Sequence, residues 1–246
     1  MDETITKTPE RGDFYIEDHA VLIGTFGRSA ASLAGSCGLH ALERAIATYG
    51  RERGHRAAMR CVADGNPLSS ENYIVYGEWD DPKGLSRTEI VSISPCLRTK
   101  VTICAWCETW KRHGLLEYGK IFCSSIDQNL VHGFNPKLSL EMGKIISWGQ
   151  DACEFEWSDC SFDSMEGAKR MMARKKELAP RVTKDFLYHC GHLLSTFERE
   201  LHLELGLLDG REIVSRAIRD YAAVFGNEKT SLVREEAGLN FMRIDS

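Results

Sequence analysis

The spacing of hydrophobic and polar residues divides the chain into helical ends and a central block with a different period. Residues 19–65 are rich in Ala, Leu and Arg, and their apolar side chains recur three and four positions apart, which is the repeat of an amphipathic helix. Gly35, Gly38 and Gly54 are expected to divide this segment into two or three helices. The segment from Met165 onward is again predicted to be helical.

The central block, residues 71–160, begins with a change to strand periodicity. The stretches "NYIVYGEW" and "RTEIVSISPCL" have the β-branched and aromatic content of strands. Between them, "DDPKG" predicts a turn. We therefore expect a first pair of strands here.

A helical stretch is predicted to begin near Val101, with a break at Gly114, and a second pair of strands follows it. These strands are "KLSLEMGKIISW" and "ACEFEWSD", joined by a tight turn at "WGQD". The order β-β-α-α-β-β predicts an α+β fold. In this fold, a four-stranded antiparallel sheet is covered by helices from the N- and C-terminal segments.

The domain organisation expected from these patterns is simple. A chain of 246 residues with 43% hydrophobic content can bury one good core, or two modest ones that share an interface. We expect a polar N-terminal arm, residues 1–16, followed by a single compact domain, residues 17–246. Its helical parts, residues 17–70 and 161–246, flank the sheet-containing core at residues 71–160.

Two helical segments resemble each other. "RAIATYGRERGHRAAMRCVADG", which begins at Arg44, shares Arg-Ala-Ile, a following Tyr and a later Gly with "RAIRDYAAVFGNEKTSLVREEAG", which begins at Arg216. A repeat seen only twice is weak evidence of repeat architecture. Duplication of a helical hairpin and the generic composition of amphipathic helices are both open explanations.

Composition and charge exclude several classes of function. The 31 basic and 36 acidic residues are scattered and give a net charge of −5, so nucleic acid is not an expected partner. The nine cysteines are irregularly spaced, and "MDETITKTPERGDF" at the N-terminus lacks the apolar core of a signal peptide. We therefore expect reduced thiols and a cytoplasmic protein. No apolar run approaches the roughly 18 to 20 residues of a membrane helix, so no membrane association is expected.

Cys123 and Asp127 are the first candidates for chemistry. They stand four positions apart on a predicted helix, so their side chains share one face. A thiol becomes a nucleophile only as a thiolate, which needs a cation, a helix N-terminus or a base nearby. A carboxylate alone would raise the pKa of the thiol. For an isolated pair, a buried cysteine beside a surface aspartate is the more common explanation.

Other cysteines and histidines give weaker signals. Cys153 alternates with glutamates in "ACEFEW" and belongs to the inward face of its strand. Cys104 and Cys107 form a single C-x-x-C, which is at best half of a zinc site or a redox pair. His189 and His192 lie three apart on a helix and could share a metal. No phosphate loop, dinucleotide fingerprint, zincin motif or serine nucleophile elbow is present, and we expect neither a metal nor a cofactor.

The central stretch resembles the L-2-amino-thiazoline-4-carboxylic acid hydrolase family over about residues 73–157. The family pattern has a cysteine before a short helix, a Gly-x-x-x-C-x-x-x-D block, an Asn-Pro turn and a strand pair ending near Gly-Asp-x-x-Cys. The residues that carry the resemblance here are Cys104 in "TICAW", Gly119, Cys123 and Asp127 in "GKIFCSSID", Phe134, Asn135 and Pro136 in "GFNP", and Gly149 and Cys153 in "WGQDACEF".

The chain also departs from the family pattern. Met142 stands where family members commonly have an arginine, and only Lys144 persists in "MGKI". A guanidinium is the natural partner of a substrate carboxylate, so its loss puts that carboxylate in doubt. Gln150 stands where the family has Asp. The layout has a looser likeness to small-ligand-binding domains of the vinyl-reductase type.

The resemblance implies a hydrolase that opens a C–N or C–S bond of a small cyclic amidine, thiazoline or lactam-like compound. Cys123 and Asp127 would be catalytic, with Cys123 as nucleophile and Asp127 as base or as the clamp for the amidinium; alternatively, Asp127 would activate water. The expected substrate-binding residues are Cys104, Asn135, Lys144 and Cys153. If a metal were needed, Cys104, Cys123 and Cys153 would be examined first.

A non-catalytic small-ligand binder or sensor is the alternative. A cavity lined by the cysteine, the carboxylate and several polar groups would favour the enzyme, and a uniformly apolar cavity would favour the binder. The natural substrate is not specified by the sequence. The oligomeric state is also open, with a homo-oligomer among the alternatives.

Overall fold

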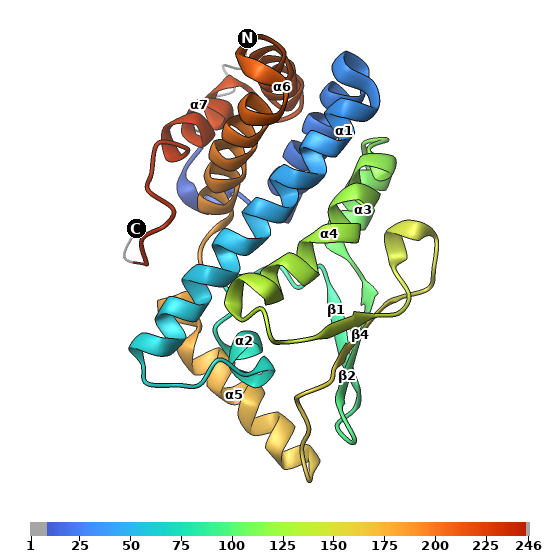
Figure 1. Ribbon diagram of the computed structural model, residues 1–246, viewed down its shortest axis with the longest axis vertical. Helices are drawn as coiled ribbons and strands as arrows, with labels where there is room; N and C mark the ends of the chain where they lie inside the picture. The colour runs from blue at the N-terminus through green and yellow to red at the C-terminus, as the bar shows by residue number, and fades with distance from the viewer. Residues whose placement is uncertain (1–8, 245–246) are drawn as a thin grey trace, which may run out of the picture.

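The computed structural model describes residues 9–244, so residues 1–8 of the expected N-terminal arm lie outside the described residues. Helices make up most of the chain, and a single antiparallel sheet lies to one side of them (Figure 1). The helices are α1 (Ile16–Ala63), α2 (Ser70–Val75), α3 (Ala105–Arg112), α4 (Leu116–Phe134), α5 (Met165–Val182), α6 (Phe186–Phe225) and α7 (Asn227–Glu236), with short 3-10 helices at Arg11–Asp13 and Ile146–Trp148.

The two longest helices, α1 and α6, are each bent back into a hairpin at a glycine. Gly35 in α1 has φ 54° and Gly206 in α6 has φ 83°, a backbone region that only glycine adopts at low cost. The prediction of a break at Gly35 is therefore confirmed. Gly38 and Gly54 lie within continuous helix instead. Gly38 allows the two arms of α1 to approach, because a Cβ there would lie 2.3 Å from the carbonyl oxygen of Ala30.

The two similar sequence segments occupy related places in these hairpins. Arg44 and Arg216, where the segments begin, each lie in the second arm of a hairpin. The matched glycines differ, because Gly54 lies inside α1 whereas Gly226, with φ 88°, ends α6. Duplication therefore stays a hypothesis.

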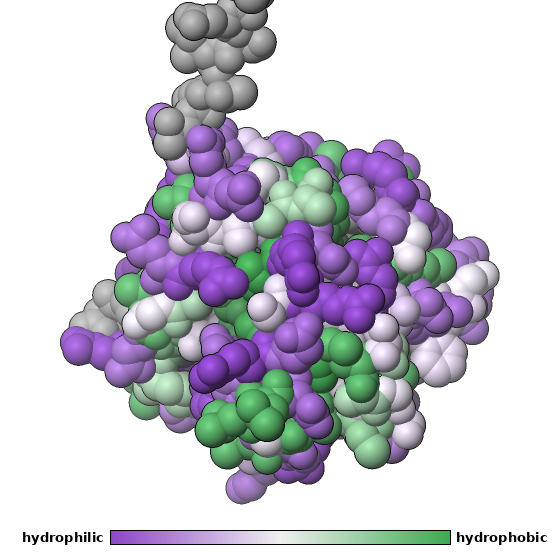
Figure 2. All heavy atoms as spheres, turned by 90° about the horizontal axis from the view of Figure 1, so that it is seen from above, coloured by the Kyte–Doolittle hydropathy of each residue, from purple (hydrophilic) through white to green (hydrophobic). Residues whose placement is uncertain are grey.

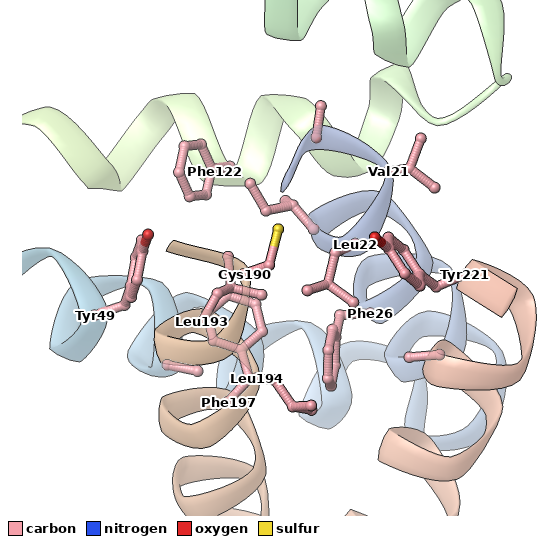
Figure 3. Close-up of a cluster of buried hydrophobic side chains, with 14 of the residues drawn as sticks. Val21, Leu22, Phe26, Tyr49, Phe122, Cys190, Leu193, Leu194, Phe197 and Tyr221 are labelled. Carbon is pink, nitrogen blue, oxygen red and sulfur yellow. The ribbon is translucent and has the colours of Figure 1, made fainter. Parts of the chain in front are cut away.

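The arms of α1 and α6 pack together with α4 around an apolar core (Figure 3). The side chains come from segments far apart in the sequence, and aromatic edges meet within the core; Phe26 and Phe197, for example, have ring centroids 5.2 Å apart. Burial of such side chains is the main force that holds the hairpins together. The labelled members of this core are Val21, Leu22, Phe26, Tyr49, Phe122, Cys190, Leu193, Leu194, Phe197 and Tyr221.

The sheet is four-stranded and antiparallel throughout, with strand order β1-β2-β4-β3. The strands are β1 (Arg87–Ser92), β2 (Leu97–Ile103), β3 (Leu140–Met142) and β4 (Cys153–Trp157). The predicted α+β class and the β-β-α-α-β-β order of the central block are confirmed.

The position of the first strand pair was predicted wrongly. The first half of the stretch "NYIVYGEW", residues 72–75, forms the end of helix α2 rather than a strand. The Ser69 side chain caps this helix by accepting from the backbone N–H of Asn72 at 3.3 Å. Both β1 and β2 lie after the "DDPKG" turn. The helix expected from Val101 begins only at Ala105, because the β-branched run before it pairs with β1 and β4.

The second strand pair is shorter than the pattern suggested. β3 ends at Met142, and Ile146–Trp148 forms a 3-10 turn that Gly149 closes with φ 87°. Alternation along β4 gives the sheet an inner and an outer face, as the pattern predicted. On the outer face, Arg98 of β2 forms an ion pair of 2.7 Å with Glu156 of β4.

Helix α4 lies between the helical bundle and the sheet (Figure 1). Glycines allow its close approach to α1: a Cβ on Gly54 would lie 2.0 Å from the carbonyl oxygen of Leu130, and one on Gly133 would lie 2.3 Å from that of Arg51. This contact uses one side of α4. The opposite side is left to face the sheet.

No helix within residues 9–244 is both long and apolar enough to cross a bilayer. Figure 2 views the molecule from above and shows mainly hydrophilic side chains, with smaller hydrophobic patches between them.

Candidate active site

A cavity of about 630 Å³ lies between α4 and the inner face of the sheet, with α2 and α5 completing its wall. Most of the lining is apolar or aromatic. The aromatic members are Tyr73, Trp79, Trp106, Trp110, Phe122, Phe155 and Trp157. The ionisable members are Glu89, Cys104, Cys123, Asp127, Cys153 and Lys175.

Four of the six residues expected to form the site line this cavity. Cys123 and Asp127 face it from successive turns of α4, as their spacing predicted. Cys104 lies at the junction of β2 and α3, and Cys153 opens β4. The backbone N–H of Ile146 donates to the Cys153 sulfur at 3.3 Å, so this cysteine is part of the cavity wall and also fixes the preceding turn.

The other two expected residues lie outside the cavity. Asn135 ends α4, where its side-chain amide donates to the carbonyl of Leu68 at 2.8 Å. Lys144 is exposed and pairs with Asp151 at 3.0 Å. The geometry gives Asn135 a structural role in the turn after α4 and gives Lys144 a place on the surface.

The Asp127 carboxyl has an unusual pKa. Burial raises its pKa from 3.8 to about 6, and the positive charge of Arg53 partly offsets the rise. No hydrogen bond to the Asp127 side chain is found among the described residues. At neutral pH this carboxylate is mostly ionised and more basic than an ordinary aspartate.

The thiols of the cavity are protonated at neutral pH. Burial raises the pKa of Cys123 well above its usual value, and the neighbouring Ser147 hydroxyl only partly offsets this. Burial also raises the pKa of Cys104 to about 12 and that of Cys153 in the same direction. Cys123 therefore needs a base before it can act as a nucleophile.

Arg53 is a functional candidate that the sequence pattern did not single out. Its guanidinium lies 4.1 Å from the centre of the Trp79 ring, which lines the cavity, and 3.4 Å from the Glu78 carboxylate. Arg56 and Arg60 hold the same carboxylate at 2.8 and 2.7 Å. The spacing of these three arginines on α1 is visible in the sequence. The carboxylate that they share belongs to another segment of the chain, so the sequence pattern did not show that they meet.

The two histidines considered for a metal do not line the cavity, although His189 packs against the lining residue Trp79, with ring centroids 5.5 Å apart. His192 contacts the Glu52 carboxylate through Nε2 at 2.8 Å, and His189 lies 3.4 Å from the carbonyl of Glu78. Cys107 is buried and is not part of the cavity lining. Within residues 9–244, no group of three or more His, Cys, Asp or Glu side chains is arranged to hold a metal ion. All nine cysteines are free.

Comparison with known proteins agrees with the resemblance seen in the sequence and extends it. The model of one family, L-2-amino-thiazoline-4-carboxylic acid hydrolase, matches residues 24–157, from the first arm of α1 to the end of β4. No curated protein and no solved structure gave a match. The matched segment covers more than half of the chain and contains Cys104, Cys123, Asp127 and Cys153, and it supports a hydrolase-like function in general terms. The chain belongs to the L-2-amino-thiazoline-4-carboxylic acid hydrolase family.

Proposed function

We propose that the protein hydrolyses a C–N or C–S bond in a small cyclic amidine or thiazoline bound in the cavity, with Asp127 as the general base. The observation that carries this proposal is the Asp127 carboxyl, which lines an aromatic cavity and has a pKa of about 6. A base whose pKa lies near the working pH is ionised enough to accept a proton and basic enough to assist its removal. The same carboxylate can hold the positive charge of an amidinium.

The proposed reaction begins with attack on the amidine carbon. Asp127 takes a proton from the attacking water as the oxygen adds to this carbon, which gives a tetrahedral intermediate. The ring bond to sulfur or nitrogen then breaks, and the proton on Asp127 passes to the leaving atom. The hydroxyl proton of the intermediate, which corresponds to the positive charge of the amidinium substrate, is released to solvent as the carbonyl forms. Cleavage of the C–S bond gives a ureido thiol, and cleavage of the ring C–N bond gives an S-carbamoyl amine.

Cys123 supports a second route through the same site. Its thiol could add to the amidine carbon after giving its proton to Asp127, and water would then release the resulting covalent adduct. The raised pKa of this thiol favours activated water over a free thiolate. In the water route, Cys123 contacts the substrate from the turn of α4 that precedes Asp127.

The binding or sensing role is the second candidate, and the mainly apolar and aromatic lining favours it. The charged and thiol side chains in the same wall favour the enzyme. A non-catalytic binder does not need a buried carboxylate with a pKa near neutrality, and burying such a carboxylate lowers the stability of the fold. We therefore prefer catalysis.

The test is a screen of thiazolines and cyclic amidines for ring opening, measured by mass spectrometry of the products. We expect the native protein to open at least one such ring. Intact-protein mass spectrometry during turnover separates the two routes, because only the thiol route adds the mass of the substrate to the chain. If the native protein binds members of the series and opens none of them, the binding role replaces the proposed one.

A further inference from the structure

Lys175 of α5 is a charged cavity residue that the proposed reaction does not use. It is half-buried and lines the same cavity as Asp127. Burial lowers its pKa, with a weaker opposing effect from Asp80. No hydrogen bond or ion pair to its ammonium group is found within residues 9–244.

The position of Lys175 is fixed by its neighbours. Arg174, near the middle of α5, donates to the side-chain oxygen of Asn72 on α2 at 2.7 Å, and Arg181, near the C-terminal end of α5, pairs with Asp64 at the end of α1. These contacts hold α5 against α2 and the end of α1. The ammonium group of Lys175 is therefore held at the cavity by a helix that is fixed at two points.

Lys175 lies on the open side of the cavity. Met172, one helical turn before it on the same face of α5, is 46% exposed and also lines the cavity. Asp127 on α4 contributes a negative charge to another part of the wall. The largely apolar cavity thus has two carboxylates, Asp127 on α4 and the exposed Glu89 on β1, and one ammonium group, that of Lys175 on α5.

We infer that Lys175 is the anion-binding residue of this cavity and that the ligand carries a carboxylate or a similarly compact anionic group. The inference rests on the proposed function for the site, and it assigns the part of the ligand that the reaction leaves untouched. Among the described residues that line the cavity, Lys175 is the only lysine and no arginine is present, so α5 supplies its one permanent cation. An unpaired, partly desolvated ammonium gains more from an anionic partner than an exposed one does.

Lys175 lies beyond the segment that matches the family. The match ends at residue 157, before α5 begins at Met165. The anion site would therefore be a feature of this chain's own C-terminal part. Its ligand would have a cationic or amidine end toward Asp127 and an acidic end toward Lys175.

The test uses a pair of ligands that the proposed reaction cannot consume. Thiazolidine-4-carboxylate and thiazolidine-4-carboxamide have the same ring, lack an amidine carbon and differ only in the anionic group. Binding is measured through the fluorescence of the cavity tryptophans, among them Trp79 and Trp106. We expect the native protein to bind the acid at least tenfold more tightly than the amide, because only the acid forms a charge-assisted hydrogen bond with the Lys175 ammonium.

Three variants show whether Lys175 causes this preference. Lys175→Met should bring the ratio of the two dissociation constants near one without weakening the amide, and Lys175→Arg should keep the preference. Lys176→Met, a change at the exposed neighbouring residue, should leave the ratio unchanged. Equal binding of acid and amide by the native protein, including no binding of either, would overturn the inference, and so would an unchanged ratio in Lys175→Met.

The result of the test of Lys175 can be distinguished from the result of the test of the proposed hydrolysis. Loss of the acid preference in Lys175→Met together with no ring opening of any amidine would keep the anion site and remove the hydrolase. Ring opening by the native protein together with an unchanged ratio would keep the hydrolase and remove the anion site.

Discussion

At the scale of single residues, the site depends on how burial changes the proton affinity of Asp127. The pKa of about 6 reflects loss of solvation opposed by Arg53. The same burial keeps the Cys123 thiol protonated. One turn of α4 therefore presents a carboxylate with a pKa near neutrality beside a protonated thiol, which suits the proposed role of Asp127 as the base.

Replacing Asp127 should separate activity from stability. Because the folded state raises the pKa of Asp127 from 3.8 to about 6, its ionised form destabilises the fold above about pH 6, and this cost vanishes below about pH 4. Asp127→Asn should therefore raise the free energy of unfolding at pH 7.5 by up to about 3 kcal/mol, with no gain at pH 4. Urea denaturation at the two pH values measures this difference. A loss of stability at pH 7.5 would contradict the assignment.

The pH profile of turnover should report the same group. If Asp127 acts as base, kcat/KM should rise with pH through an apparent pKa near 6. Arg53→Met removes the charge that opposes the shift, so this midpoint should move to higher pH. Arg51→Met, on the exposed side of the same helix, is the control and should leave it in place. A midpoint that does not move in Arg53→Met would exclude Arg53 as the charge that tunes the base.

At the scale of elements, α4 is the part that couples the bundle to the site. One side of it rests on α1 through glycines, and the other carries Cys123 and Asp127 into the cavity. Any shift of α4 away from α1 would change the position of both side chains relative to the sheet.

A side chain at the α1–α4 crossing should disturb this coupling. In Gly54→Ala the new Cβ would lie 2.0 Å from the backbone oxygen of Leu130, which cannot rotate away, so we expect a loss of about 1 to 3 kcal/mol in the free energy of unfolding. Gly12→Ala is the matched control, because nothing lies within 4 Å of a Cβ at that exposed position. Equal stability of the two variants in urea titrations would show that α4 does not depend on this contact.

The elements also show what could be predicted from the sequence. The alternation in "ACEFEW" placed Cys153 on the inner face of β4 because one face of the sheet is buried, and the four-residue spacing put Cys123 and Asp127 on one side of α4. "NYIVYGEW" misled because a local cap at Ser69 outweighed its β-branched content. The cap is a single residue that lies before the stretch, whereas strand propensity is judged from the composition of the stretch itself. The composition alone therefore does not show that the helix is favoured.

The charged partners of the site could not be found in the same way. Arg53 comes from α1 and Lys175 from α5, and only tertiary packing brings these helices to the cavity occupied by Asp127. Asn135 and Lys144 were expected at the site from the family pattern along the chain. The structure places Asn135 in the turn after α4 and Lys144 on the surface, which the order of residues along the chain does not reveal.

At the scale of the whole molecule, the bundle buries histidines that resist protonation. Burial lowers the pKa of His192 to about 4 and lowers the pKa values of His19 and His189 in the same direction. In the unfolded chain these groups take up protons near pH 6.5. Burying these neutral histidines therefore carries no protonation penalty above pH 6.5. As the pH falls from 6.5 toward 4, the free energy of unfolding decreases, because the unfolded chain takes up protons that the folded protein does not.

His192→Gln should reduce this acid sensitivity. Glutamine keeps a donor for Glu52 but cannot take up a proton in the unfolded chain. Between pH 6 and 4.5, the slope of the free energy of unfolding against pH should fall by up to ~1.4 kcal/mol per pH unit relative to the native protein. Chemical denaturation at a series of pH values gives both slopes. Identical slopes would show that His192 is protonated in the folded protein.

The central claim is that Asp127 carries out hydrolysis in this cavity. The most direct measurement is the rate of ring opening of L-2-amino-thiazoline-4-carboxylic acid or an active related thiazoline, followed by mass spectrometry, in the native protein, Asp127→Asn and the exposed control Asp163→Asn. We expect ring opening by the native protein and by the control, and its loss in Asp127→Asn, with all three proteins equally folded by circular dichroism. Ring opening by Asp127→Asn at the native rate would exclude Asp127 as the catalytic base.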